Sequence, residues 1–278
     1  MTLSTIAVHL DHTERCEARA LLAARLAKRH GSHLRGIVPT SVRKEAVMPP
    51  RYAAEGLAVM VSPSLHLRRR AETVAHIFLD RVRGLGPPSF DVRLVDGEPV
   101  DAIVAQGRAG DLLIVGQADG SAAVEDAARR LPEEVMLHAG VSVLILPRTG
   151  RFDAVGDKVL VAWDGGREAA FSVRGALPLL RRASQVTLVS MEHARDAAAA
   201  RCGCEAASWL RRHDIEAVVE QRAGCADFAA TLLGCASMAG ADLIVMGGYG
   251  HARSRERILG GVTRDVLARA CVPVLMAH

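Results

Sequence analysis

Aromatic residues are scarce in this chain: phenylalanine, tryptophan and tyrosine together make up 3% of its 278 residues. Few side chains can therefore stack on bases, and a net charge of +4 is too small for a nucleic-acid surface. We predict no nucleic-acid partner. Half of the residues are hydrophobic, so the core must consist mainly of alanine, valine, leucine and isoleucine, which suits helices packed on a parallel sheet.

Long hydrophobic runs are also missing. No apolar stretch approaches the roughly 20 residues that a membrane-spanning helix needs. Residues 3–10 form a short strand-like run that His9 interrupts and Asp11 follows, which is not the pattern of a secretion signal. We therefore predict a cytoplasmic protein with no membrane partner, in which the six cysteines are reduced.

The chain contains the same pattern twice. The sequence DLLIVG at residues 111–116 reappears as DLIVMG at residues 242–247, an offset of 242 − 111 = 131. The same offset carries VSVLIL at 141–146 onto VPVLMA at 272–277. Each copy thus closes with strand, helix and strand at identical spacing, which indicates a tandem duplication.

The two copies also open alike, with a β-rich run that ends in Asp11 or Asp164. Here the offset is 164 − 11 = 153, so the first copy carries extra residues, which we place in the loop-like stretch from Pro39 to Pro63. Alternating strands and helices predict an α/β fold with two doubly wound parallel sheets of five strands. We expect the first repeat over residues 1–148 and the second over 157–278.

Ligands of open parallel sheets bind beyond the carboxyl ends of the strands, where the winding reverses. In the second copy the strand predicted at residues 243–246 runs into Gly247 and Gly250. Glycine lets the backbone approach a bulky ligand and adopt positive φ, so we expect both properties here.

Two further glycines, Gly260 and Gly261, precede a helix that we expect to begin near Val262. Exposed amide groups at such a helix start attract phosphate. His251 and Arg253 lie between the glycine pairs, where their side chains can meet phosphate oxygens. The pattern favours an anion site over an ordinary tight turn.

The spacing Gly247-x-x-Gly250-x9-Gly260, preceded by Asp-Leu-Ile-Val-Met, resembles the ATP-binding signature of the universal stress protein superfamily. The similarity covers nearly the whole chain as a tandem pair. The resemblance implies Rossmann-like repeats of the adenine nucleotide alpha hydrolase type and a regulatory role in the stress response, with ATP, ADP or AMP as the ligand, with or without Mg²⁺.

The same resemblance assigns roles to individual residues. Asp164 would hold the adenosine portion, and Ala162 lies at the matching position two residues earlier. Met191 and Met246 would flank the adenine. The residues that would cradle the ribose and phosphates are Gly247, Gly250, Gly260, Gly261 and Val262. The family pattern has serine or threonine where this chain has Gly261, and the next hydroxyl is that of Thr263.

The first copy serves as an internal control. At the offset of 131, Gly116 is equivalent to Gly247, but the first copy has Asp119 at the position of Gly250 and Pro132 at the position of Thr263. The glycine pair is replaced by Arg129 and Arg130. A carboxylate repels phosphate and proline lacks an amide donor, so we predict that the first repeat has lost the nucleotide site.

Two other functions stay open. A scaffold that binds only proteins would need no nucleotide, and slow ATP hydrolysis would need a base that the sequence does not reveal. No Gly-x4-Gly-Lys-Ser/Thr motif is present, and no metal site is predicted, since Cys202 and Cys204 fall in a helical stretch without a second cysteine pair. The resemblance to tandem family members implies that the final strands of the repeats pair as an intramolecular pseudo-dimer, and further homodimerisation and an unidentified protein partner remain open.

Overall fold

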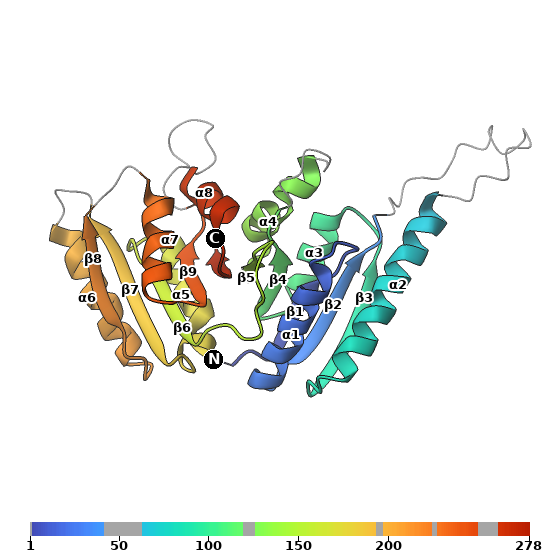
Figure 1. Cartoon of the computed structure of the whole chain (residues 1–278), viewed down its shortest axis with the longest axis horizontal. Coiled ribbons are helices and arrows are strands. Elements are labelled where there is room, and N and C mark those ends of the chain that lie inside the picture. Colours follow the sequence, from blue (N-terminus) through green and yellow to red (C-terminus); the bar gives the residue numbers. More distant parts are fainter. Residues whose placement is uncertain (1, 42–62, 119–125, 193–196, 224–226, 250–260) are drawn as a thin grey trace, which may run out of the picture.

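The computed structural model describes residues 2–41, 63–118, 126–192, 197–223, 227–249 and 261–278. Its strands form one mixed sheet in the order β3-β2-β1-β4-β5-β10-β9-β6-β7-β8 (Figure 1). All neighbours are parallel except β5 and β10. The predicted α/β class is confirmed, and the two five-stranded halves are joined edge to edge into a single sheet.

The first repeat alternates strands and helices as the sequence predicts. Its elements are β1 (Thr5–His9), α1 (Cys16–His30), β2 (His33–Pro39), α2 (Pro63–Arg83), β3 (Ser89–Val95), α3 (Pro99–Gly107), β4 (Leu112–Gly116), α4 (Asp126–His138) and β5 (Ser142–Leu146). The extra residues of this copy fall between β2 and α2, and residues 42–62 lie outside the described part.

The second repeat has the same order of elements. They are β6 (Lys158–Ala162), α5 (Arg167–Leu180), β7 (Gln185–Glu192), α6 (Ala197–Arg211), β8 (Val218–Ala223), α7 (Phe228–Met238), β9 (Leu243–Gly247), α8 (Gly261–Arg269) and β10 (Val274–Ala277). In both repeats the first strand lies between the second and the fourth, so the winding reverses beside β1 and beside β6.

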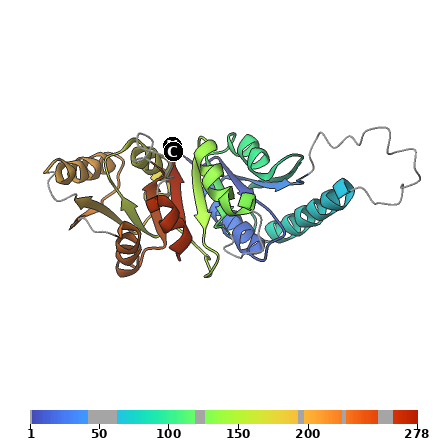
Figure 2. The same cartoon turned by 90° about the horizontal axis from the view of Figure 1, so that it is seen from above.

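Helices cover both faces of the sheet, as Figure 2 shows from above. Buried residues of α1, α2, α5 and α6 form one hydrophobic cluster with the sheet, and those of α3, α4, α7 and α8 form the other. The inner strands β1, β4, β5, β6, β9 and β10 are almost completely buried and rich in valine, leucine and isoleucine, the composition of strands covered on both faces, whereas the edge strands β3 and β8 are more exposed.

The repeated aspartates, Asp111 and Asp242, have a structural role. The Asp111 carboxylate accepts the amide protons of Ser4 and Thr5, at 2.7 and 2.9 Å, where the chain enters β1. Asp242 does the same at the entry to β6, accepting from three consecutive amides, those of residues 156–158, at about 3.0 Å. Each aspartate fixes the first strand of its repeat beside the fourth, which explains why the motif recurs at one offset.

The two repeats meet as related halves. The final strands pair around Leu144 opposite Leu275, residues that are equivalent at the offset of 131. The expected pairing of the final strands is therefore confirmed. Equivalent helix positions also meet: Glu133 of α4 forms a 3.5 Å ion pair with Arg264 of α8. A pair of identical subunits would place like charges there. The two repeats have therefore diverged at this position, and the opposite charges stabilise their contact.

Candidate functional site

The predicted nucleotide site lies at the carboxyl ends of β6 and β9, which are neighbouring parallel strands. Ala162 is the last residue of β6, and Asp164 follows it with an exposed side chain. The Asp164 carboxylate accepts the Gly166 amide at 2.7 Å, and Gly166 caps the start of α5. Met246 and Gly247 end β9 at the same edge. The fold thus brings these predicted residues to one place at a reversal of the winding.

The first turn of α8 is held at this edge by a hydrogen bond. The backbone amide of Tyr249 donates to the Thr263 hydroxyl at 3.2 Å, and both side chains are buried. Gly261 and Val262, at the start of α8, are exposed. The Thr263 hydroxyl therefore accepts a main-chain proton, and the exposed surface of the first turn is formed by residues without hydroxyl groups.

Some predicted residues cannot be placed. Gly250, His251, Arg253 and Gly260 lie outside the described residues. Met191 lies near the end of β7, beside β6 in the sheet, but only its backbone is described.

The expectation of positive φ at Gly247 is wrong. Gly247 is not among the residues with positive φ in the described part of the chain, whereas Tyr249 has φ of 59°. The absent side chain matters for packing: a Cβ at Gly247 would lie 2.6 Å from the amide nitrogen of Ala169 in α5. This glycine lets the first turn of α5 rest directly on the end of β9.

Tyr249 reaches toward the first repeat. Its ring is buried, and burial together with the Glu133 carboxylate raises the pKa of its hydroxyl. Next to it, Gly248 lies against Met136 of α4, because a Cβ there would be 2.6 Å from the methionine sulfur. The backbone that follows β9 is therefore part of the contact between the two repeats.

The equivalent corner of the first repeat is built around Arg19, a buried arginine that the sequence analysis missed. Its Nε donates to the His9 carbonyl at 2.7 Å, and its Nη2 donates to the Asp11 carboxylate at 2.8 Å. The other carboxylate oxygen of Asp11 accepts from the Thr13 amide at 2.9 Å and from the Thr13 hydroxyl at 2.5 Å. Both oxygens of Asp11 are thus engaged within the protein.

These contacts fix the charges at the corner. Burial by itself would raise the pKa of Asp11, but the neighbouring Arg19 charge and the other partners lower it to about 2. Burial lowers the pKa of His9 to about 4, with a further contribution from Arg19. At neutral pH the corner therefore holds an ionised Asp11–Arg19 pair beside an uncharged imidazole.

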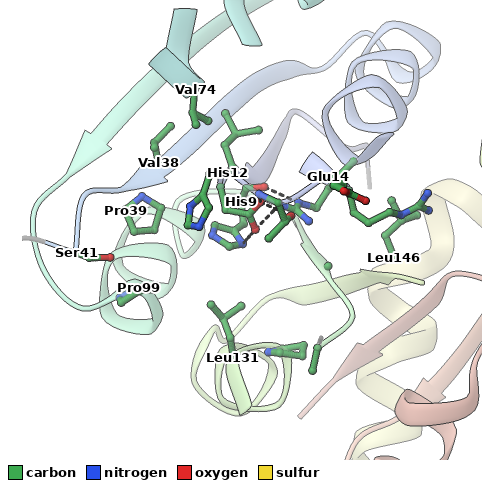
Figure 3. A pocket seen from close by; sticks show the side chains of 18 of the residues that line it. His9, His12, Glu14, Val38, Pro39, Ser41, Val74, Pro99, Leu131 and Leu146 are labelled. Carbon is green, nitrogen blue, oxygen red and sulfur yellow. Dashed lines mark hydrogen bonds and ion pairs between the residues drawn. The ribbon is translucent and has the colours of Figure 1, made fainter. Parts of the chain in front are cut away.

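A cavity of about 820 Å³ opens beside this corner, at the carboxyl ends of β1, β2, β4 and β5. Figure 3 shows His9 and His12 near its middle, Val38, Val74, Pro39 and Pro99 on one side, and Glu14 and Leu146 on the other. The sequence could have indicated that the two corners differ, because Arg19 of the first repeat is equivalent to Ser172 of the second at the offset of 153.

The fold and the paired corners define a tandem, doubly wound α/β protein. Within this chain, residues 156–278 match the model of the Universal stress protein family. Comparison with curated proteins gives no match. Within the described residues, no helix has the length and apolar character needed to cross a membrane.

Solved structures share the fold over the whole length. A universal stress protein from Archaeoglobus fulgidus has a TM-score of 0.75 at 17% identity, covering 99% of this chain and 96% of its own. A functionally unknown protein from Pseudomonas aeruginosa has a TM-score of 0.63 at 17% identity, with 98% and 92% covered. A shorter match is an Archaeoglobus fulgidus universal stress protein in complex with dAMP, at 18% identity and a TM-score of 0.36, covering 52% of this chain and 98% of its own.

Proposed function

We propose that the second repeat, residues 157–278, binds an adenine nucleotide and acts as a nucleotide-responsive module of the stress response. The proposal rests on one observation: Asp164 follows β6 and Gly247 ends β9, neighbouring parallel strands where the winding reverses, and the Tyr249–Thr263 bond holds the start of α8 at the same edge. ATP is the proposed ligand, with ADP and AMP as alternatives and Mg²⁺ as a possible companion of the phosphates.

The residues at this edge suit such a ligand. The exposed Asp164 carboxylate can accept protons from ribose hydroxyls, and the exposed main chain at Gly261 and Val262 can donate to phosphate oxygens. Ala162 occupies the position that the imidazole of His9 fills in the first repeat, so this side of the edge carries less bulk.

We further propose that the first repeat, residues 1–148, does not bind nucleotide at its equivalent corner. Arg19 and Thr13 take three of the roughly four acceptor positions of the Asp11 carboxylate, so a ribose hydroxyl would compete with bonds that are already formed. A Cβ at Gly116 would lie 2.5 Å from Arg19 Nη1, so the arginine also fills the space beside this glycine.

Calorimetry with ATP, ADP and AMP, with and without Mg²⁺, tests the proposal. Asp164→Asn should weaken binding about tenfold, because a charged hydrogen-bond acceptor is lost. Asp11→Asn is the matched control and should leave the affinity within about twofold. The assignment fails if Asp11→Asn abolishes binding while Asp164→Asn does not.

A protein-binding scaffold is the second candidate. The observation in its favour is the first turn of α8, where Gly261 has no hydroxyl and that of Thr263 already accepts the Tyr249 amide. If the scaffold is correct, none of the three nucleotides will give a binding heat, and the wild type and both variants will behave alike.

A further inference from the structure

The cavity of the first repeat has two chemically different sides. One side carries apolar side chains, Val38 from β2, Val74 from α2 and Pro99 from the start of α3, with the exposed Arg70 of α2 beside them (Figure 3). The other side carries Arg15 and Arg148, which lie near the chain that leaves β5. A ligand that spans the cavity would therefore meet hydrocarbon at one end and positive charge at the other.

The charged residues around the cavity favour an anion. Four arginines line it, against the carboxylates of Asp11 and Glu14. Arg19 already balances Asp11, at 2.8 Å. Arg15 Nη2 is held by the carbonyls of Pro147 and Gly150, at 3.1 and 2.9 Å, which keeps its positive charge in place at this side.

Arg148 is the arginine best suited to meet a ligand. Its side chain is exposed, and its guanidinium forms no hydrogen bond or ion pair with the residues that the structure describes. Its backbone amide is fixed by Gln117 at 2.8 Å, so the residue is anchored at the cavity wall while the charged group is available. A guanidinium binds a carboxylate through two parallel hydrogen bonds.

We propose that this cavity binds a small carboxylate with an apolar chain, its charged group at Arg148 and its chain against Val38 and Val74. The volume, about 820 Å³, falls in the range of small-molecule sites, roughly 300–1,000 Å³. Arg19 and Thr13 take three of the roughly four acceptor positions of the Asp11 carboxylate, which disfavours a ribose here, so the ligand class differs from that proposed for the second repeat. This site does not depend on nucleotide binding elsewhere in the chain.

Calorimetry of the full-length protein with octanoate as the probe tests the proposal. Octanoate should bind at least about tenfold more tightly than acetate, which lacks the chain, and than octan-1-ol, which lacks the charge. Equal binding of octanoate and octan-1-ol would show that the arginines play no part and would overturn the proposal, as would no binding of octanoate.

Two matched pairs of variants place the ligand. Val74→Asp should weaken octanoate binding about tenfold, because it puts a carboxylate on the apolar wall, whereas Ile77→Asp, exposed on the same helix, should change it less than about twofold. Arg148→Gln should weaken binding about fivefold, and Arg151→Gln, another exposed arginine, should not. The Arg148 pair keeps the test valid if Val74→Asp unfolds α2. Equal affinities within the Arg148 pair would overturn the site.

Competition with ATP separates this proposal from the preceding one. ATP at millimolar concentration should leave octanoate binding unchanged. If ATP displaces octanoate and Arg148→Gln weakens both ligands, the cavity is a nucleotide site and both proposals fail. If ATP gives no heat at all while octanoate binds as expected, only the nucleotide site of the second repeat is lost.

Discussion

Arg19 of α1 and Ser172 of α5 occupy equivalent positions in the two repeats, but their side chains make different contacts. Ser172 accepts the Ala277 amide at 2.8 Å and donates to the Glu168 carbonyl at 2.9 Å, so it joins the start of α5 to the last strand. Arg19 instead reaches the end of β1 and pairs with Asp11.

The way each first helix meets the fourth strand differs accordingly. At Gly247 the nearest atoms to an added Cβ belong to Glu168 and Ala169 of α5, whereas at Gly116 they belong only to the Arg19 guanidinium. The first repeat thus uses a long charged side chain where the second uses direct contact of helix and strand. In the first repeat this exchange of residue type brings an arginine onto the Asp11 carboxylate.

Among the substitutions that test this difference between the repeats, the removal of Arg19 should lower the free energy of unfolding most. Arg19→Met leaves the Asp11 carboxylate, which is 21% exposed, without its charged partner, and should lower the free energy of unfolding by about 3 kcal/mol. Ser172→Ala, at the equivalent position, loses neutral hydrogen bonds and should cost about 1 kcal/mol. Urea denaturation at pH 7 measures both, and equal losses would show that the arginine pair is not a special feature of the first repeat.

Adding a methyl group at the two equivalent glycines sharpens the difference in packing. Gly247→Ala places a Cβ against the backbone of α5, which cannot move without shifting the helix, and should cost about 2 kcal/mol. Gly116→Ala meets only the Nη1 end of the Arg19 side chain, which can tilt more easily than a helix backbone can move, and should cost about 1 kcal/mol. Denaturation curves compare the two; a larger loss for Gly116→Ala would contradict the packing described for these corners.

The smallest expected effect concerns acid stability. His9 stands where the second repeat has Ala162, and its pKa falls from 6.5 to about 4 on burial. The unfolded chain therefore binds more protons between these pH values, so lowering the pH from 7 to 5.5 should remove about 1 kcal/mol of stability through His9. This contribution is fully present above pH 6.5 and lost as the pH falls toward 4.

The variant His9→Asn removes that contribution. His30, whose pKa burial also lowers to about 4, stays in place, so the loss of stability between pH 7 and 5.5 should fall by about half. Denaturation at the two pH values measures the change. An unaltered pH dependence in His9→Asn would mean that the imidazole is not buried uncharged at this corner.

Much of the fold could be predicted because it is written in local patterns. Alternating apolar runs and amphipathic stretches gave the order of strands and helices, and the recurrence of residues 111–116 at 242–247 gave the duplication. The structure explains why this motif occurs in both copies, because Asp111 and Asp242 each hold the start of the first strand of their repeat. The predicted edge at Asp164 and Gly247 followed from the rule for parallel sheets.

The sites could be predicted only in part, because side-chain roles depend on residues far apart in the chain. The role of Gly247 was predicted wrongly. A glycine at the end of a strand can allow a positive φ or the close approach of another element, and only the position of α5 decides between the two. No motif in the sequence singled out Arg19. Its burial became visible only once β1 and β4 were placed around it.

The amino-acid sequence by itself determined the alternation of elements and the duplication, because these follow from periodicity and from local backbone preferences. Tertiary structure decided that the two sheets become one, that Arg19 engages the aspartate of the first repeat, and that a cavity opens there. These features depend on how closely each helix approaches its strand, and that distance is set by side chains that meet only after the chain has folded.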